Sequence, residues 1–104
     1  MDYLIVAGGG KVAAVNPDSG NIKWETTLKS SMKLSGEVTL LIQRDVIYAA
    51  CQGYLFCLDR HNGNIKWDNG LKGFGLGNMV IAHNGKIAGI RHDTSDYNAS
   101  GGNI

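Results

Sequence analysis

The chain has 104 residues, of which 43% are apolar and only 18% are charged, and its formal net charge at pH 7 is +1. A charged fraction below the roughly 25% typical of globular domains favours an ordered protein that buries much of its surface. A net charge this close to zero creates no global attraction for nucleic acid or for an anionic membrane, and we expect neither as a partner.

The opening segment, MDYLIVAGGG, has no basic residue ahead of its short apolar run. Such a run is too short for the core of a signal peptide or for a membrane-spanning helix. We therefore expect a cytoplasmic protein.

Short runs rich in β-branched and aromatic residues follow one another along the chain and end at Gly, Asn or Asp. No stretch keeps the apolar spacing of three and four residues over the length of a helix. The sequence therefore predicts an all-β protein without helix. In chain order, the expected strands are Leu4–Ala7, Lys11–Asn16, Asn21–Leu28, Glu37–Gln43, Val46–Ala50, Tyr54–Asp59, Asn64–Asn69, Met79–His83 and Lys86–Arg91.

Tight turns are expected between several of these strands. The pairs Gly9-Gly10 and Gln52-Gly53 permit the positive φ angles of two-residue hairpins, and the segments PDSG and RHNG supply four-residue turns. These turn residues predict antiparallel neighbours that follow one another in the chain.

The hairpin at Gln52-Gly53 also determines where the two cysteines lie. It pairs Cys51 with Tyr54 and Cys57 with Tyr48. Since the cysteines are not opposite each other, we expect no disulfide between them. We expect both to be small buried residues that neither react nor bind metal.

The chain repeats itself. The segment AVNPDSGNIKW, Ala14–Trp24, recurs as CLDRHNGNIKW, Cys57–Trp67, and the residues upstream align at the same offset of 43 positions. A period of this length lies in the range of single blades of a β-propeller. The sequence therefore predicts repeated blades.

The shared pattern A-x-(N/D)-x-x-(S/N)-G-x-x-x-W resembles the tryptophan-docking motif of quinoprotein-type β-propellers, the pyrroloquinoline-quinone-like repeat family, and the resemblance covers about Leu4–Arg91. In that family the Trp packs against a neighbouring blade and the Gly permits the tight turn. The resemblance thus implies structural roles for Gly20, Trp24, Gly63 and Trp67. Asn16 in place of the usual Asp is a conservative departure.

The resemblance does not extend to the family's quinone enzymes. Those enzymes hold the cofactor between a Trp and a ring of adjacent cysteines, with calcium beside a catalytic Asp, whereas this chain has no Cys-Cys pair. His61, His83 and His92 lack the mutual spacing of metal ligands. We therefore expect no enzyme activity, no cofactor and no metal.

In blade order the chain has strands two to four of one blade (4–28), a complete blade (37–69) and a partial third (78–91). Residues 1–91 are thus a two-blade unit of four-stranded antiparallel sheets, followed by a polar tail, 92–104. Because propellers have four to eight blades, we expect a homo-oligomeric ring, with a six-blade trimer preferred to an eight-blade tetramer. A fragment of a longer propeller is the competing interpretation.

One expected rim collects several lysines with aromatic side chains between them. We expect it to bind another protein, one with acidic groups, while a merely solvated rim is the simpler interpretation. The predicted function is a non-catalytic binding protein, for instance an inhibitor or an immunity protein. The alternative is a lectin-like propeller that binds a glycan or a small ligand. The candidate binding residues are Lys11, Lys29, Lys33, Tyr54, Lys72 and Phe74.

Overall fold

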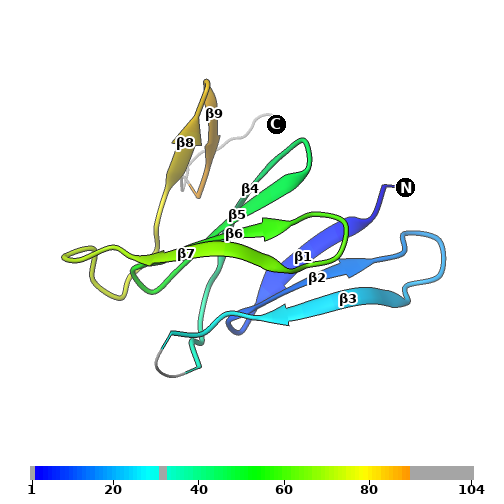
Figure 1. Ribbon diagram of the computed structural model, residues 1–104, viewed down its shortest axis with the longest axis horizontal. Helices are drawn as coiled ribbons and strands as arrows, with labels where there is room; N and C mark the ends of the chain where they lie inside the picture. The colour runs from blue at the N-terminus through cyan, green and yellow to red at the C-terminus, as the bar shows by residue number, and fades with distance from the viewer. Residues whose placement is uncertain (1, 31–32, 90–104) are drawn as a thin grey trace, which may run out of the picture.

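The computed structural model describes residues 2–30 and 33–89. The expected tail, 92–104, and positions 90 and 91 of the last expected strand lie outside the described residues. The described residues form three antiparallel sheets and no helix, which confirms the all-β prediction (Figure 1).

The three sheets have three, four and two strands. Each sheet is a simple meander, because neighbours in the chain are also neighbours in the sheet. The four-stranded sheet contacts both of the others, and Figure 1 shows it between them. The strands are β1 (Leu4–Gly8), β2 (Lys11–Val15) and β3 (Ile22–Thr27); β4 (Thr39–Gln43), β5 (Val46–Cys51), β6 (Tyr54–Asp59) and β7 (Ile65–Gly70); and β8 (Ile81–His83) and β9 (Lys86–Ala88).

All nine expected strands are present in the expected order, with small differences at their ends. The largest difference is in β9, which ends at Ala88 and not at Arg91. The next residue, Gly89, has a φ of 91°, which lies outside the extended region and stops the strand.

The predicted hairpin geometry is confirmed. Gly9 and Gly10 have φ angles of 57° and 75°, so both turn residues adopt the left-handed conformation of a type I′ turn. In the second hairpin, Cys51 pairs with Tyr54 and Tyr48 pairs with Cys57, as the sequence predicted.

The two cysteines are free and buried. Burial raises the pKa of the Cys51 thiol, and it also raises that of Cys57 although Lys66 opposes the shift. Both thiols therefore stay protonated near neutral pH, which makes them poor nucleophiles.

The core lies between the first and second sheets. β2 and β3 turn one apolar face toward β5 and β6, and the side chains of the two faces form one buried cluster. Burial of this apolar area is the main favourable term in the folding of the two sheets together. The buried cluster consists of Val12, Ala14, Trp24, Leu28, Leu34, Ile47, Ala49, Cys51, Phe56 and Leu58.

Trp24 joins this core to the turn that follows β6. Its indole N–H donates a hydrogen bond to the carbonyl of Arg60 at 3.2 Å, and the hydroxyl of Thr26 donates to the carbonyl of Gly63 at 2.6 Å. The ring lies directly on Gly63, since a Cβ there would be 2.6 Å from Trp24 Cδ2. Gly63 thus provides both a φ of 79° and the room for the indole.

The third sheet rests on β4. The hydroxyl of Thr39 donates to the carbonyl of Met79 at 2.8 Å, and the side chains of Gln43 and His83 form a hydrogen bond. His83 also meets the ring of Tyr48 edge-on, with 6.1 Å between the centroids. The short hairpin β8–β9 is therefore attached to the inner strand of the second sheet.

The contact between Trp24 and Gly63 yields a stability prediction. Gly63→Ala combines the strain of a positive φ with a collision against Trp24 and Thr26, and we expect it to lose about 1–3 kcal/mol more than a variant that suffers the strain alone. Chemical unfolding followed by strand circular dichroism measures the difference.

The matched control is Gly73→Ala. Gly73 has a similar φ of 88°, but no atom lies within 4 Å of the position that its Cβ would occupy. We expect this variant to lose about 1 kcal/mol. Equal losses in the two variants would contradict the role assigned to the indole contact.

Candidate functional site

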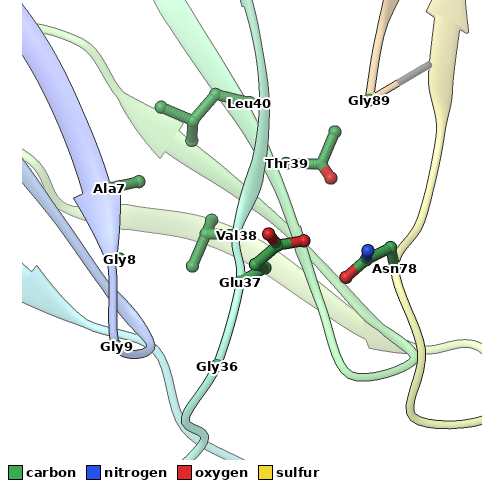
Figure 2. A pocket seen from close by; sticks show the side chains of 10 residues that line it. All are labelled: Ala7, Gly8, Gly9, Gly36, Glu37, Val38, Thr39, Leu40, Asn78 and Gly89. Atoms are coloured by element: carbon green, nitrogen blue, oxygen red, sulfur yellow. The ribbon is translucent and has the colours of Figure 1, made fainter. Parts of the chain in front are cut away.

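One hollow lies between β1, the segment before β4 and the end of the third sheet (Figure 2). Its volume is about 620 Å³, and its lining is mostly glycine and aliphatic residues. Among the described residues of the lining, Glu37 is the only charged one, with Thr39 and Asn78 as polar neighbours. The Thr39 hydroxyl is already engaged as a donor to a backbone carbonyl. The described part of the lining therefore offers one carboxylate and no second titratable group beside it for acid–base or nucleophilic catalysis.

A second hollow, of about 260 Å³, lies on the rim where the β5–β6 hairpin meets the loop after β7. The structure brings Tyr54 and Lys72, two of the predicted binding residues, together in its lining. Phe74 follows on the same loop and is 62% exposed, and Leu76 is 77% exposed. Phe74 and Leu76 are thus large apolar side chains presented to solvent beside a lysine.

The backbone holds this loop in place. The N–H of Leu71 donates to the carbonyl of Gly53 at 2.9 Å, and the N–H of Phe74 donates to the carbonyl of Leu71 at 3.2 Å. Gly53 approaches the carbonyl of Gly75 so closely that a Cβ could not fit between them. We call this loop, Leu71–Leu76, the rim loop.

The other predicted lysines lie elsewhere. The ammonium of Lys11 is 3.4 Å from the carboxylate of Glu25, in a hollow on the outer face of the first sheet. Lys29 and Lys33 pair with each other through an isolated bridge after β3. Neither of these sites shares the hollow that holds Tyr54 and Lys72.

The opposite rim contains a larger hollow of about 650 Å³. Arg44, Lys66 and Lys86 line it together, and Asp45 is the one carboxylate among the described residues of this lining. Lys66 and Lys86 are not among the binding residues predicted from the sequence. Lys66 alternates with the apolar residues of its strand, which predicts that it lies on the solvent-exposed face. The sequence near each residue does not indicate that Arg44, Lys66 and Lys86, from three separate segments, line the same hollow.

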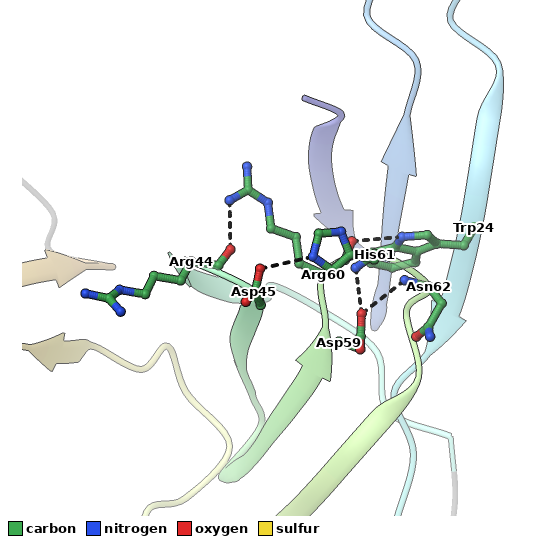
Figure 3. A network of polar contacts seen from close by, with 7 residues as sticks. All are labelled: Trp24, Arg44, Asp45, Asp59, Arg60, His61 and Asn62. Carbon is green, nitrogen blue, oxygen red and sulfur yellow. Dashed lines mark hydrogen bonds and ion pairs between the residues drawn. The ribbon is translucent and has the colours of Figure 1, made fainter. Parts of the chain in front are cut away.

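A polar network fixes the turn that receives Trp24 (Figure 3). The N–H of Arg60 donates to the carbonyl of Asp45 at 2.9 Å, and its guanidinium donates to the carbonyl of Arg44 at 3.0 Å. The ring of His61 lies 3.1 Å from the carboxylate of Asp45. The β4–β5 turn therefore supports the β6–β7 turn, and this network is structural.

The two repeated turns have the same internal hydrogen bonds. Asp59 Oδ1 accepts from the N–H groups of His61 and Asn62 at 2.7 and 3.3 Å, and Asn16 Oδ1 accepts from the corresponding N–H groups in the first repeat. The donors, first of all the N–H of His61, hold the pKa of Asp59 below its ordinary value. Asn16 accepts the corresponding hydrogen bonds through a neutral amide oxygen.

Trp67 differs from Trp24 in its surroundings although the motif around it is the same. Its side chain is 45% exposed, whereas that of Trp24 is 9% exposed. Its ring lies 6.3 Å from that of Tyr48, beside an apolar hollow of about 240 Å³. The hollow is bounded on its far side by Ile81 and His83 of the third sheet.

Residues 2–30 and 33–89 contain neither a cluster of metal-ligating side chains nor a membrane-spanning helix. No three His, Cys, Asp or Glu side chains gather there in a group that could hold a metal ion. Nor does that part of the chain contain a helix of the length and apolarity needed to cross a membrane.

Comparison with known proteins identifies the repeat. A model of the pyrroloquinoline-quinone-like repeat family, described as outer membrane protein assembly factor BamB, matches residues 1–96. The matched range includes both copies of the motif, which confirms the resemblance drawn from them. None of the curated proteins that were compared with the chain matches it.

The hydrogen bonds to Asp59 yield a pH prediction. The folded protein lowers the pKa of Asp59. The charged carboxylate of Asp59 therefore contributes its full stabilisation above the pKa of the unfolded chain, and this stabilisation is lost as the pH falls through the lower pKa of the folded protein. We expect Asp59→Asn to lose less stability than the wild-type protein between pH 5 and pH 3, measured by denaturant unfolding at each pH.

Asp18→Asn is the control, because the Asp18 carboxylate accepts none of the hydrogen bonds within the first turn, where Asn16 Oδ1 and Ser19 Oγ are the side-chain acceptors. We expect this variant to keep the wild-type pH dependence. A wild-type pH dependence in Asp59→Asn would show that the two N–H bonds do not favour the charged carboxylate.

Proposed function

Since the chain belongs to the family of outer membrane protein assembly factor BamB, we propose that it is a non-catalytic interaction protein that binds another protein through the rim loop. The family description names an assembly factor, a role that depends on contacts between proteins.

The observation that carries the proposal is the exposure of Phe74 and Leu76 on a loop held by backbone hydrogen bonds. A few aromatic and apolar anchors contribute most of the affinity in protein interfaces. A loop already held in one conformation loses less conformational entropy when it binds. The rim loop therefore has both properties of a docking element.

The charge beside these anchors defines the partner further. Lys72 shares the hollow with Tyr54, whose phenol adds a hydrogen-bonding group to an apolar ring. The partner that fits is a protein segment with an apolar side chain for the hollow and an acidic residue for Lys72. Inhibition of such a partner, as by an immunity protein, stays a prediction.

The glycan-binding alternative has a different location. Lectin sites place an exposed aromatic ring beside polar groups, and Trp67, close to Tyr48 and to the hollow at His83, is the exposed indole of the described chain. A glycan that changes the fluorescence of Trp67 would favour this alternative. Binding through the rim loop leaves Trp67 unaffected.

A selection from a random peptide library tests the proposal. We expect the peptides enriched on the wild-type protein to be apolar and acidic. We expect Phe74→Ser and Leu76→Ser each to weaken their binding by about 10-fold or more, as loss of an interface anchor does. Lys72→Glu weakens them through charge repulsion, and fluorescence anisotropy of labelled peptides measures the dissociation constants.

The control is Lys66→Glu, which makes the same change of charge on the opposite rim. We expect it to leave peptide binding unchanged. Peptides that bind Phe74→Ser as well as the wild type but lose binding to Lys66→Glu would transfer the site to the other rim and refute the proposal.

A further inference from the structure

Two faces of the described sheets are at least partly uncovered, one on the first sheet and one on the second sheet, at the side that is turned toward the third. On the first sheet, Leu4 and Val6 of β1 are 54% and 48% exposed. On the second sheet, Trp67 of β7 is 45% exposed, and its indole N–H has no acceptor among residues 2–30 and 33–89. Large apolar faces of this kind mark interaction surfaces.

The repeat relates the first uncovered face to a buried one. Counting 43 positions along the chain, Leu4 corresponds to Ile47 and Val6 corresponds to Ala49. Ile47 and Ala49 have no exposed area, because the face of the first sheet that carries Trp24 covers them. Leu4 and Val6 are therefore the repeat equivalents of the residues on the second sheet that pack against the Trp24 face of the first sheet.

The turn that would receive Trp67 is also present. Gly20 corresponds to Gly63 and has the same φ of 79°. A Cβ at Gly63 would collide with Trp24, whereas no atom lies within 4 Å of a Cβ at Gly20. The Gly20 turn has the same internal hydrogen bonds as the Gly63 turn. It therefore already has the conformation that accepts an indole, although no ring lies on it.

We propose that Trp67 of one copy of this chain packs on the Gly20 turn of a second copy, so that copies join head to tail through the interface that joins the first two sheets within one chain. By repeat equivalence, the Trp67 indole N–H donates to the carbonyl of Pro17, which stands where Arg60 stands in the second repeat. Asn69 takes the place of Thr26, and its amide donates to the carbonyl of Gly20.

One strand must give way in this assembly. In this assembly β8 of one copy and β1–β3 of the next copy form one blade. β9 of the first copy and β1 of the second copy would then both be the second strand of that blade, as β5 is in the four-stranded sheet. β1 pairs with its neighbour along five residues and β9 along three, so β9 is the strand that leaves. β8 then pairs with β1 of the next copy and completes a four-stranded blade.

A head-to-tail interface closes into a ring when the rotation between copies permits. Three copies supply six blades, which is within the range of four to eight that propellers use. The partner on these faces is thus a second copy of the chain. This self-assembly goes beyond the rim-loop function and does not depend on it.

Light scattering behind a sizing column measures the assembly of the full 104-residue chain at several concentrations. We expect a mass of three chains for the wild type and of one chain for Trp67→Ala and for Val6→Asp, with a dissociation constant raised on the order of 100-fold by either change. Both positions are exposed in the single chain, so both variants keep their circular dichroism. A wild-type protein that stays monomeric overturns the proposal.

Mixing the variants tests the head-to-tail arrangement. Trp67→Ala retains an intact Gly20 turn, and Val6→Asp retains an intact Trp67, so an equimolar mixture is expected to form a complex of two chains that neither variant forms alone. Self-association of Val6→Asp by itself would mean a two-fold contact between Trp67 faces and would overturn the proposal.

Phe74→Ser separates this inference from the proposed function. We expect it to keep the wild-type mass, because the rim loop lies outside the two faces, while it loses peptide binding. Dissociation of Phe74→Ser to single chains would move the interface to the rim and overturn the inference. Failure of the peptide selection alone refutes only the rim-loop function.

Discussion

The indole of Trp24 lies on a turn that only glycine can form at position 63, and the packing of the first sheet on the second depends on this contact. The ring is large enough to cover the outer part of the neighbouring sheet, and its N–H gains the carbonyl of Arg60 so that no polar group is buried alone. Trp24 therefore contributes buried apolar area, and its hydrogen bond fixes how the first sheet is oriented on the second. The buried cluster of β2, β3, β5 and β6 lies behind it.

The turn under the indole is held by the backbone and needs few particular side chains. Asn16 and Asp59 accept the same pair of N–H bonds, and Ser19 and Asn62 accept the following one. Since any of these oxygens serves as acceptor, the side chains can differ between repeats while the turn stays the same. Only glycine fits at position 63, because the backbone there has a positive φ and the indole of Trp24 leaves no room for a Cβ.

Such a fold separates structure from function. The facing sides of the first two sheets are occupied by packing on each other, so the surfaces available for recognition are the rims and the faces of these sheets that stay uncovered. The rim loop extends Phe74 and Leu76 away from the core, and it is held by one backbone hydrogen bond to the β5–β6 hairpin and one within the loop. The uncovered faces instead carry the half-exposed indole of Trp67 on the second sheet and, on the first sheet, the Gly20 turn, which no ring covers among the described residues.

The sequence by itself determined the strands, the hairpin turns, the pairing of Cys51 with Tyr54 and the repeated blade, because these depend on residues close together in the chain or on a fixed period. Only the tertiary structure decided the surroundings of each copy of the motif. Trp24 is buried and Trp67 is half exposed within the same local sequence, since burial depends on which distant segment packs on the ring, as the Gly63 turn does on Trp24. For the same reason Lys11 meets Glu25, and Arg44, Lys66 and Lys86 converge, only once distant strands have been placed side by side.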